Sequence, residues 1–188
     1  MKITEQELLA LFPEFDMIQD QGLRAKSIRV WLRACEASDW EKLTDIPFSG
    51  GFTPEPDNLV YHVRLTTQYS YAVAQRSNGL QKTQVNMDII VAGALLHDVC
   101  KVVEYSSKGG KGAWGQQVTH GIYGICLCQE EGLPMEIIHI IASHTDKLGM
   151  PNKSLEAIII HQCDNIAAAG SYLISRGKVK SGGKWVDL

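Results

Sequence analysis

Apolar residues recur at helical spacing through most of the chain, and no segment alternates convincingly between apolar and polar residues as a half-buried strand does. Apolar side chains three or four residues apart share one face of a helix, and this face is the one that a bundle buries. We therefore predict an all-α fold, a single bundle of about six or seven helices. Helices are predicted before Pro13 and over residues 20–38, 58–75, 86–104, 118–131, 135–145 and 154–169.

Residues with cap chemistry mark several of these helix ends. Thr4 and Glu7 have the spacing of a capping box ahead of the first apolar run. Asn152 or Ser154 is placed to begin the last helix, and Gly170 follows it as a C-terminal cap. The last helix is therefore expected to end near residue 169.

Interruptions in the pattern divide the chain. Residues 106–117 contain four glycines and no periodicity, which predicts a flexible loop. Pro and Gly residues are also dense between 45 and 57. We expect N-terminal helices and a loop at 1–57 that pack on the core, a helical domain at 58–170, and a polar C-terminal tail at 171–188.

Composition narrows the class of protein. The 188 residues include 45% hydrophobic residues and carry a net charge of −3, which provides a core but no electrostatic attraction to nucleic acid polymers or anionic membranes. Neither a signal peptide nor an apolar run of about 20 residues is apparent. The five cysteines include no CxxC pair, so no disulfide framework is expected. These features predict a cytoplasmic protein whose oligomeric state is left open.

The dipeptide His97-Asp98 is the first candidate for chemistry, because it lies at the end of the very apolar stretch AGALL. An aspartate is almost never fully buried unless it is paired or binds a metal ion. Adjacent side chains on a helix point about 100° apart. The pair could therefore reach one metal ion from two sides, or the carboxylate could bridge two metal ions.

Other histidines and an aspartate lie at intervals on separate predicted helices. A helical bundle that directs such side chains inward is a common way to build a metal site. His139 precedes His144 by five residues and should point elsewhere, and His161, one turn before Asp164, is expected only to flank the site. The predicted ligands are His62, His97, Asp98, His120, His144 and Asp164.

The order H…HD…H…H…D resembles the HD superfamily of metal-dependent phosphohydrolases, over about residues 58–169. The resemblance to its six-ligand subgroup implies two metal ions bridged by Asp98. It also implies a nucleotide-like phosphoester or phosphoanhydride as a small-molecule substrate, cleaved by a metal-bound hydroxide. The sequence HDVCK resembles the HDxxK form, in which the lysine contacts substrate phosphate, and this assigns Lys101 a catalytic and substrate-binding role.

The sequence departs from the cyclic-dinucleotide phosphodiesterase subgroup, whose Gly-Tyr-Pro signature is replaced here by Gly-Met-Pro at 149–151. Lys108 and Lys111 lie in the glycine-rich segment 106–117. They could bind substrate phosphate, or they could belong to a solvated loop.

Histidines and carboxylates together suit Fe, Mn, Zn, Ni or Co better than Mg or Ca. Two other functions stay open at this stage. A few members of the superfamily use the same six ligands as a di-iron site for oxygen-dependent cleavage, and a degenerate member could act as a non-catalytic binding module.

Overall fold

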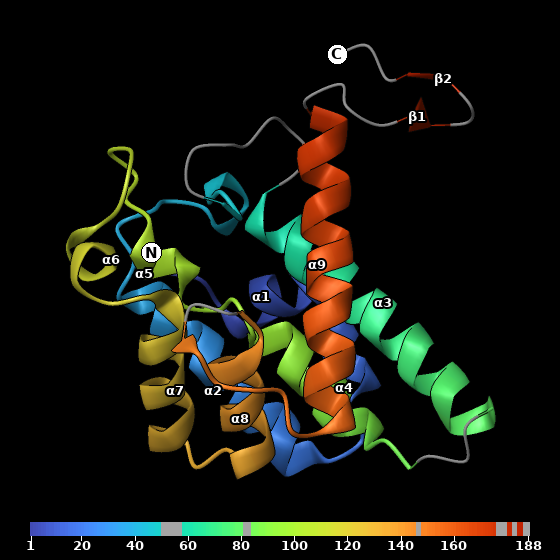
Figure 1. The fold of residues 1–188 in the computed structure, drawn as a ribbon. Coiled ribbons are helices and arrows are strands. Elements are labelled where there is room, and N and C mark those ends of the chain that lie inside the picture. The colour runs from blue at the N-terminus through green and yellow to red at the C-terminus, as the bar shows by residue number, and fades with distance from the viewer. Residues whose placement is uncertain (50–57, 81–83, 146–147, 176–179, 182–183, 186–188) are drawn as a thin grey trace.

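A computed structural model describes residues 1–49, 58–80, 84–145, 148–175, 180–181 and 184–185. The all-α fold class is confirmed (Figure 1), and two single-turn helices, α5 and α6, bring the number of α-helices in the described residues above the predicted six or seven. The elements are α1 (Glu5–Leu11), η1 (Pro13–Met17), α2 (Gln21–Glu36), η2 (Leu43–Asp45), α3 (Leu59–Leu80), α4 (Met87–Leu96), α5 (Lys101–Glu104), α6 (Ala113–Gln117), α7 (His120–Glu130), α8 (Met135–Ser143), α9 (Leu155–Ser175) and a short antiparallel pair, β1 (Lys180–Ser181) and β2 (Lys184–Trp185).

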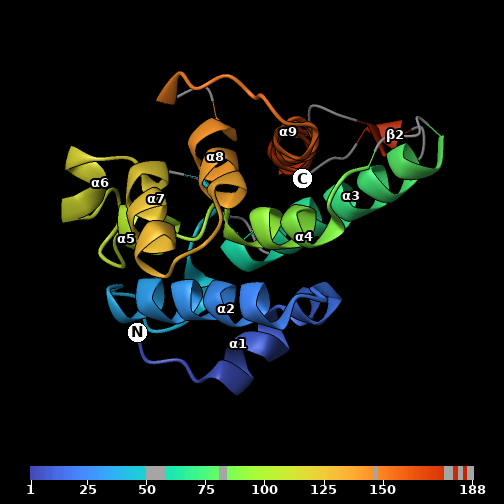
Figure 2. The ribbon, with the colours of Figure 1, turned by 90° about the horizontal axis from the view of Figure 1, so that it is seen from below.

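Helix α4 is the centre of the bundle. Figure 2 shows α1 and α2 on one side of it and α8 and α9 on the other, and α4 contacts α2, α3, α8 and α9. Every residue from 89 to 96 is buried, as expected of a helix that is apolar all round. A Cβ at Gly93 would lie 2.7 Å from Ile140 Cδ1 and 3.0 Å from Ile160 Cδ1, so this glycine permits the close approach of α8 and α9.

The prediction of one continuous helix over 86–104 is wrong. Helix α4 ends at Leu96, and α5 begins at Lys101. Between them the backbone tightens, because Val99 N donates to Leu96 O at 3.2 Å and Lys101 N donates to Asp98 O at 3.0 Å. The His97-Asp98 pair therefore lies in a turn between two helices, which we call the HD turn (residues 97–100).

The predictions for segment 106–117 and for the end of the last helix need correction, whereas the predicted capping box is confirmed. The loop predicted over 106–117 is wrong for its second part, because α6 occupies residues 113–117, while Tyr105 and Lys111 pair in an isolated bridge across the first part. Gly170 does not cap α9, which continues to Ser175. The capping box of α1 is present, with Thr4 Oγ1 accepting from Glu7 N at 3.2 Å. No helix in the described parts of the chain has both the length and the apolar character that a membrane span requires.

The N-terminal region holds the backbone on both sides of the HD turn. Three of its side chains donate hydrogen bonds to carbonyl oxygens there, namely Trp31 Nε1 to Leu95 (2.9 Å), Ser38 Oγ to Val102 (2.6 Å) and Trp40 Nε1 to Tyr105 (2.9 Å). These oxygens lie near the ends of α4 and α5, where helical partners are missing. The position of the HD turn thus depends on residues far from it in the sequence.

We predict that Trp31→Phe lowers the free energy of unfolding by about 1–3 kcal/mol, because the buried carbonyl oxygen of Leu95 loses its side-chain donor. Urea denaturation measures the change. Trp114→Phe is the control, since Trp114 is 53% exposed and a phenyl ring can still stack on Tyr123. Equal stability of the two variants would contradict the proposed anchoring of the HD turn.

Candidate metal centre

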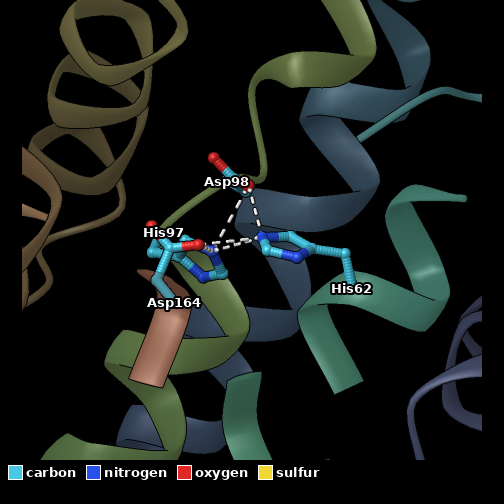
Figure 3. Close-up of side chains that lie close together, drawn as sticks. All are labelled: His62, His97, Asp98 and Asp164. Carbon is cyan, nitrogen blue, oxygen red and sulfur yellow. Dashed lines mark hydrogen bonds and ion pairs between the residues drawn. The ribbon is translucent and has the colours of Figure 1, made fainter. Parts of the chain in front are cut away.

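The structure brings the six predicted ligands together inside the bundle. Figure 3 shows four of them converging from α3, the HD turn and α9, and the other two come from the start of α7 and the end of α8. All are buried except Asp164, whose side chain is 13% exposed. The six residues are His62, His97, Asp98, His120, His144 and Asp164.

The two oxygens of Asp98 divide these side chains into two groups. Oδ2 lies 3.2 Å from His62 Nε2 and 3.3 Å from His97 Nε2. Oδ1 lies 3.2 Å from His120 Nε2 and 3.6 Å from His144 Nε2. We call His62, His97, Asp98 and Asp164 the first group, and Asp98, His120 and His144 the second group. Within each group, the potential ligand atoms lie within 4.8 Å of one another.

The arrangement of protons at the histidines fits a bound cation. The Nδ1 atoms of His97 and His144 face the carbonyl oxygens of Ala94 (2.6 Å) and Ile141 (2.8 Å), which can only accept, so these nitrogens carry the proton. In a neutral ring Nε2 is then an acceptor. In the first group, His97 Nε2 lies 3.4 Å from His62 Nε2. In the second group, His144 Nε2 lies 3.3 Å from His120 Nε2.

Lone pairs therefore converge on the carboxylate of Asp98, whose Oδ1 has no hydrogen-bond partner among the described residues. Such a set of buried acceptors requires a cation, either a proton or a metal ion. The observed donors, imidazole nitrogen and carboxylate oxygen, suit a divalent transition metal.

The electrostatic field at the centre favours positive charge. Burial opposes protonation of His97, but Asp98 and Asp164 outweigh it and raise its pKa to about 10. Burial also opposes ionisation of Asp98, yet Lys101 and His97 hold the pKa of this carboxyl well below its usual range. The field that stabilises a proton on His97 also attracts a divalent cation.

The three lysines predicted to bind substrate lie in different places. Lys101 is beside the centre, with Nζ 2.6 Å from Asp98 Oδ2 and 5.9 Å from the centroid of the Phe48 ring. Lys111 instead pairs with Glu104 Oε1 at 3.1 Å, and Lys108 is exposed. A substrate role stays a prediction for each of them.

The two remaining histidines are outside both groups of potential ligands. His139 Nε2 accepts from Lys153 N at 3.1 Å. His161 Nδ1 lies 2.6 Å from the carbonyl oxygen of His144, so it flanks the centre through the backbone.

Sequence reasoning missed two residues beside the centre. The Glu104 carboxylate accepts from His120 Nδ1 and from His120 N, the latter at 3.1 Å. Burial disfavours its ionised form, but His120 and then Lys111 outweigh burial and lower the pKa of Glu104 to about 2. The signal in the sequence was an acidic residue within the apolar run VVEY.

Phe48 is the second missed residue, and it stacks on His62 with ring centroids 4.9 Å apart and an angle of 23°. His62 Nδ1 has no hydrogen-bond partner among the described residues, so the stack adds to the contacts of Nε2 with Asp98 and Asp164 in orienting this ring. Phe48 comes from the segment before α3, and nothing in its sequence context distinguishes it from an ordinary core residue.

Comparison with known proteins agrees with this geometry. The sequence profile of the HD domain matches residues 59–169, more than half of the chain, so the chain belongs to the HD domain family. Family membership and the cluster of histidines and aspartates together indicate divalent metal binding. No solved structure matches the chain significantly.

Three curated proteins show what the chain is similar to. A dihydroneopterin 2',3'-cyclic phosphate phosphodiesterase of Methanocaldococcus jannaschii is 31% identical over 56% of this chain and 44% of its own length. A ribonuclease Y of Oleidesulfovibrio alaskensis is 28% identical over 81% of this chain and 30% of its own length. A tRNA (cytidine(56)-2'-O)-methyltransferase of Thermoplasma volcanium is 25% identical over 62% of this chain and 34% of its own length. The chain thus spans less than half the length of each.

We predict that added Mn²⁺, Co²⁺ or Zn²⁺ raises the Tm and that a chelator reverses the rise, since a ligand bound only to the native state stabilises it, by about 2.7 kcal/mol at 100 times the Kd. His97→Gln should reduce the shift, because it removes one nitrogen of the first group. Thermal denaturation with and without metal measures it. His139→Gln is the matched control outside both groups, and an equal loss in this variant would contradict the site.

Proposed function

We propose that the protein is a metal-dependent phosphohydrolase that cleaves a phosphoester or phosphoanhydride bond in a small, nucleotide-like substrate. The observation that carries the proposal is the position of the buried Asp98 carboxylate, with one oxygen facing each group of histidines. Two metal ions sharing this carboxylate would supply an acidified water as nucleophile and would neutralise charge on the phosphoryl oxygens. The proposed ligands are His62, His97 and Asp164 for one ion and His120 and His144 for the other.

The protein's own groups have separate tasks in this reaction. Lys101 is a cation at the edge of the centre, and its side chain is 13% exposed. In the proposed reaction its ammonium group would leave its ion pair with Asp98 and bind a phosphoryl oxygen of the substrate. The hydrogen bonds at Nδ1 of His97 and His144 fix the direction in which each Nε2 points. His97 and Asp98 directly follow the buried apolar residues 89–96 of α4, which would keep bulk water from that side of the centre.

The names of the relatives support two candidate substrates for this proposal. The phosphodiesterase of M. jannaschii is named for a cyclic phosphate of a small molecule, which favours a small phosphodiester such as a 2′,3′-cyclic nucleotide. The relatives named ribonuclease Y favour RNA as the second candidate. The net charge of −3 supports the small molecule, because an RNA chain requires an extended basic surface.

We predict that Asp98→Ala loses both metal ions and hydrolysis together, because both groups lose a shared carboxylate. Metal analysis of the purified protein gives the first readout. A screen of cyclic and linear nucleotides, with an RNA oligonucleotide as a separate arm, gives the second. Asp16→Asn is the control, since its ion pair with Arg24 is exposed and contributes little.

Three outcomes would overturn the proposal or change it. Absence of bound metal in the wild type would overturn it. Retained hydrolysis in Asp98→Ala would remove Asp98 from the reaction. Bound iron with dioxygen consumption and no hydrolysis would assign the di-iron oxygenase function instead.

A further inference from the structure

Glu104 is a buried carboxylate whose two oxygens are both occupied. Oε2 accepts from the backbone N–H of His120 at 3.1 Å and from its Nδ1, and Oε1 pairs with Lys111 Nζ at 3.1 Å. The residue is 2% exposed. Burying a carboxylate is costly unless such partners are present, so these contacts offset the cost of burying Glu104.

The chain between Lys111 and His120 is built closely around this residue. The backbone carbonyl of Glu104 accepts from Gly112 N at 2.8 Å. A Cβ at Gly115 would lie 2.1 Å from the same carbonyl oxygen, a distance that no side chain could occupy. Helix α6 therefore covers Glu104 directly, and the carboxylate faces His120 under this cover.

Glu104 distinguishes His120 from the other histidines of the centre. His97 and His144 donate from Nδ1 to neutral backbone carbonyls, whereas His120 donates to a carboxylate. An anionic partner makes the imidazole a stronger donor to a metal ion than a neutral carbonyl does, and it fixes the proton on Nδ1. Nε2 of His120 is then an acceptor, 3.2 Å from Asp98 Oδ1.

We propose that Glu104 is a positioning residue that sets the affinity of the second metal position, formed by Asp98, His120 and His144, by holding the ring of His120 in one orientation and one tautomer. The inference rests on the proposed two-metal centre. In this proposal Lys111 is the counter-ion of Glu104. Lys111 then affects the centre through Glu104 and His120 and does not bind the substrate.

Glu104→Gln tests this proposal, because glutamine keeps the shape of the side chain and removes its charge. Co²⁺ titration of the metal-free protein, followed by calorimetry and visible absorption, resolves the two binding steps. We expect the Kd of the second step to rise about 10–100-fold while the first step is unchanged. Lys111→Gln should weaken the second step less, since its ion pair is half-exposed and the carboxylate remains.

Glu14→Gln is the matched control, since Glu14 is also buried and pairs with Arg64 at 2.9 Å, outside both ligand groups. It should lower the Tm without changing either Co²⁺ step. The proposal is overturned if Glu104→Gln changes only the Tm, or if the wild-type protein shows a single binding step. Both readouts are independent of hydrolysis, so a failure of the proposed function would be recognised separately.

Discussion

The burial of the Asp98 carboxylate is the constraint on which the rest of the structure depends. The side chain is 1% exposed, and a carboxylate in such a position must be compensated by positive charge. Four imidazole rings and Lys101 surround it; His97 and Lys101 lie beside it in the sequence, and the other three rings come from separate helices. The topology of the bundle can be understood as the means of bringing these groups to one carboxylate, because α3, α7, α8 and α9 each contribute a ligand beside the end of α4.

The interruption of the helix after α4 allows one carboxylate to face both groups of histidines. In a continuous helix Asp98 would be fixed along the buried face of α4, but the HD turn places it beyond the helix end. The turn is held by hydrogen bonds from Trp31, Ser38 and Trp40, all outside residues 59–169 that the HD domain profile matches. Helix α2 and the segment that follows it therefore support the metal centre without supplying a potential ligand.

The sequence was sufficient for the fold class, the capping box of α1 and the set of side chains that meet at Asp98. Each depends on local pattern, because buried polar residues in apolar helices are visible without a structure. The break at 97–100, the formation of α6 and the passage of α9 through Gly170 depend on long-range contacts that periodicity does not contain. Phe48 was missed for the same reason, since its role exists only through the contact with His62. Glu104 stands out as an acidic residue in an apolar run, but its partner His120 is visible only in the structure.

The charges around the centre are consistent with the proposed combination of a metal ion and a phosphate substrate. Without a metal ion, the carboxylates of Asp98, Asp164 and Glu104 are balanced by Lys101, Lys111 and the proton on His97, whose pKa is raised to about 10. The protein groups alone therefore leave no net positive charge to attract a phosphate. In the proposed reaction, bound divalent cations would make the local charge positive and would take the same carboxylates as ligands. They would replace Lys101 as the counter-ion of Asp98, so that its ammonium group would be available to a phosphoryl oxygen of the substrate.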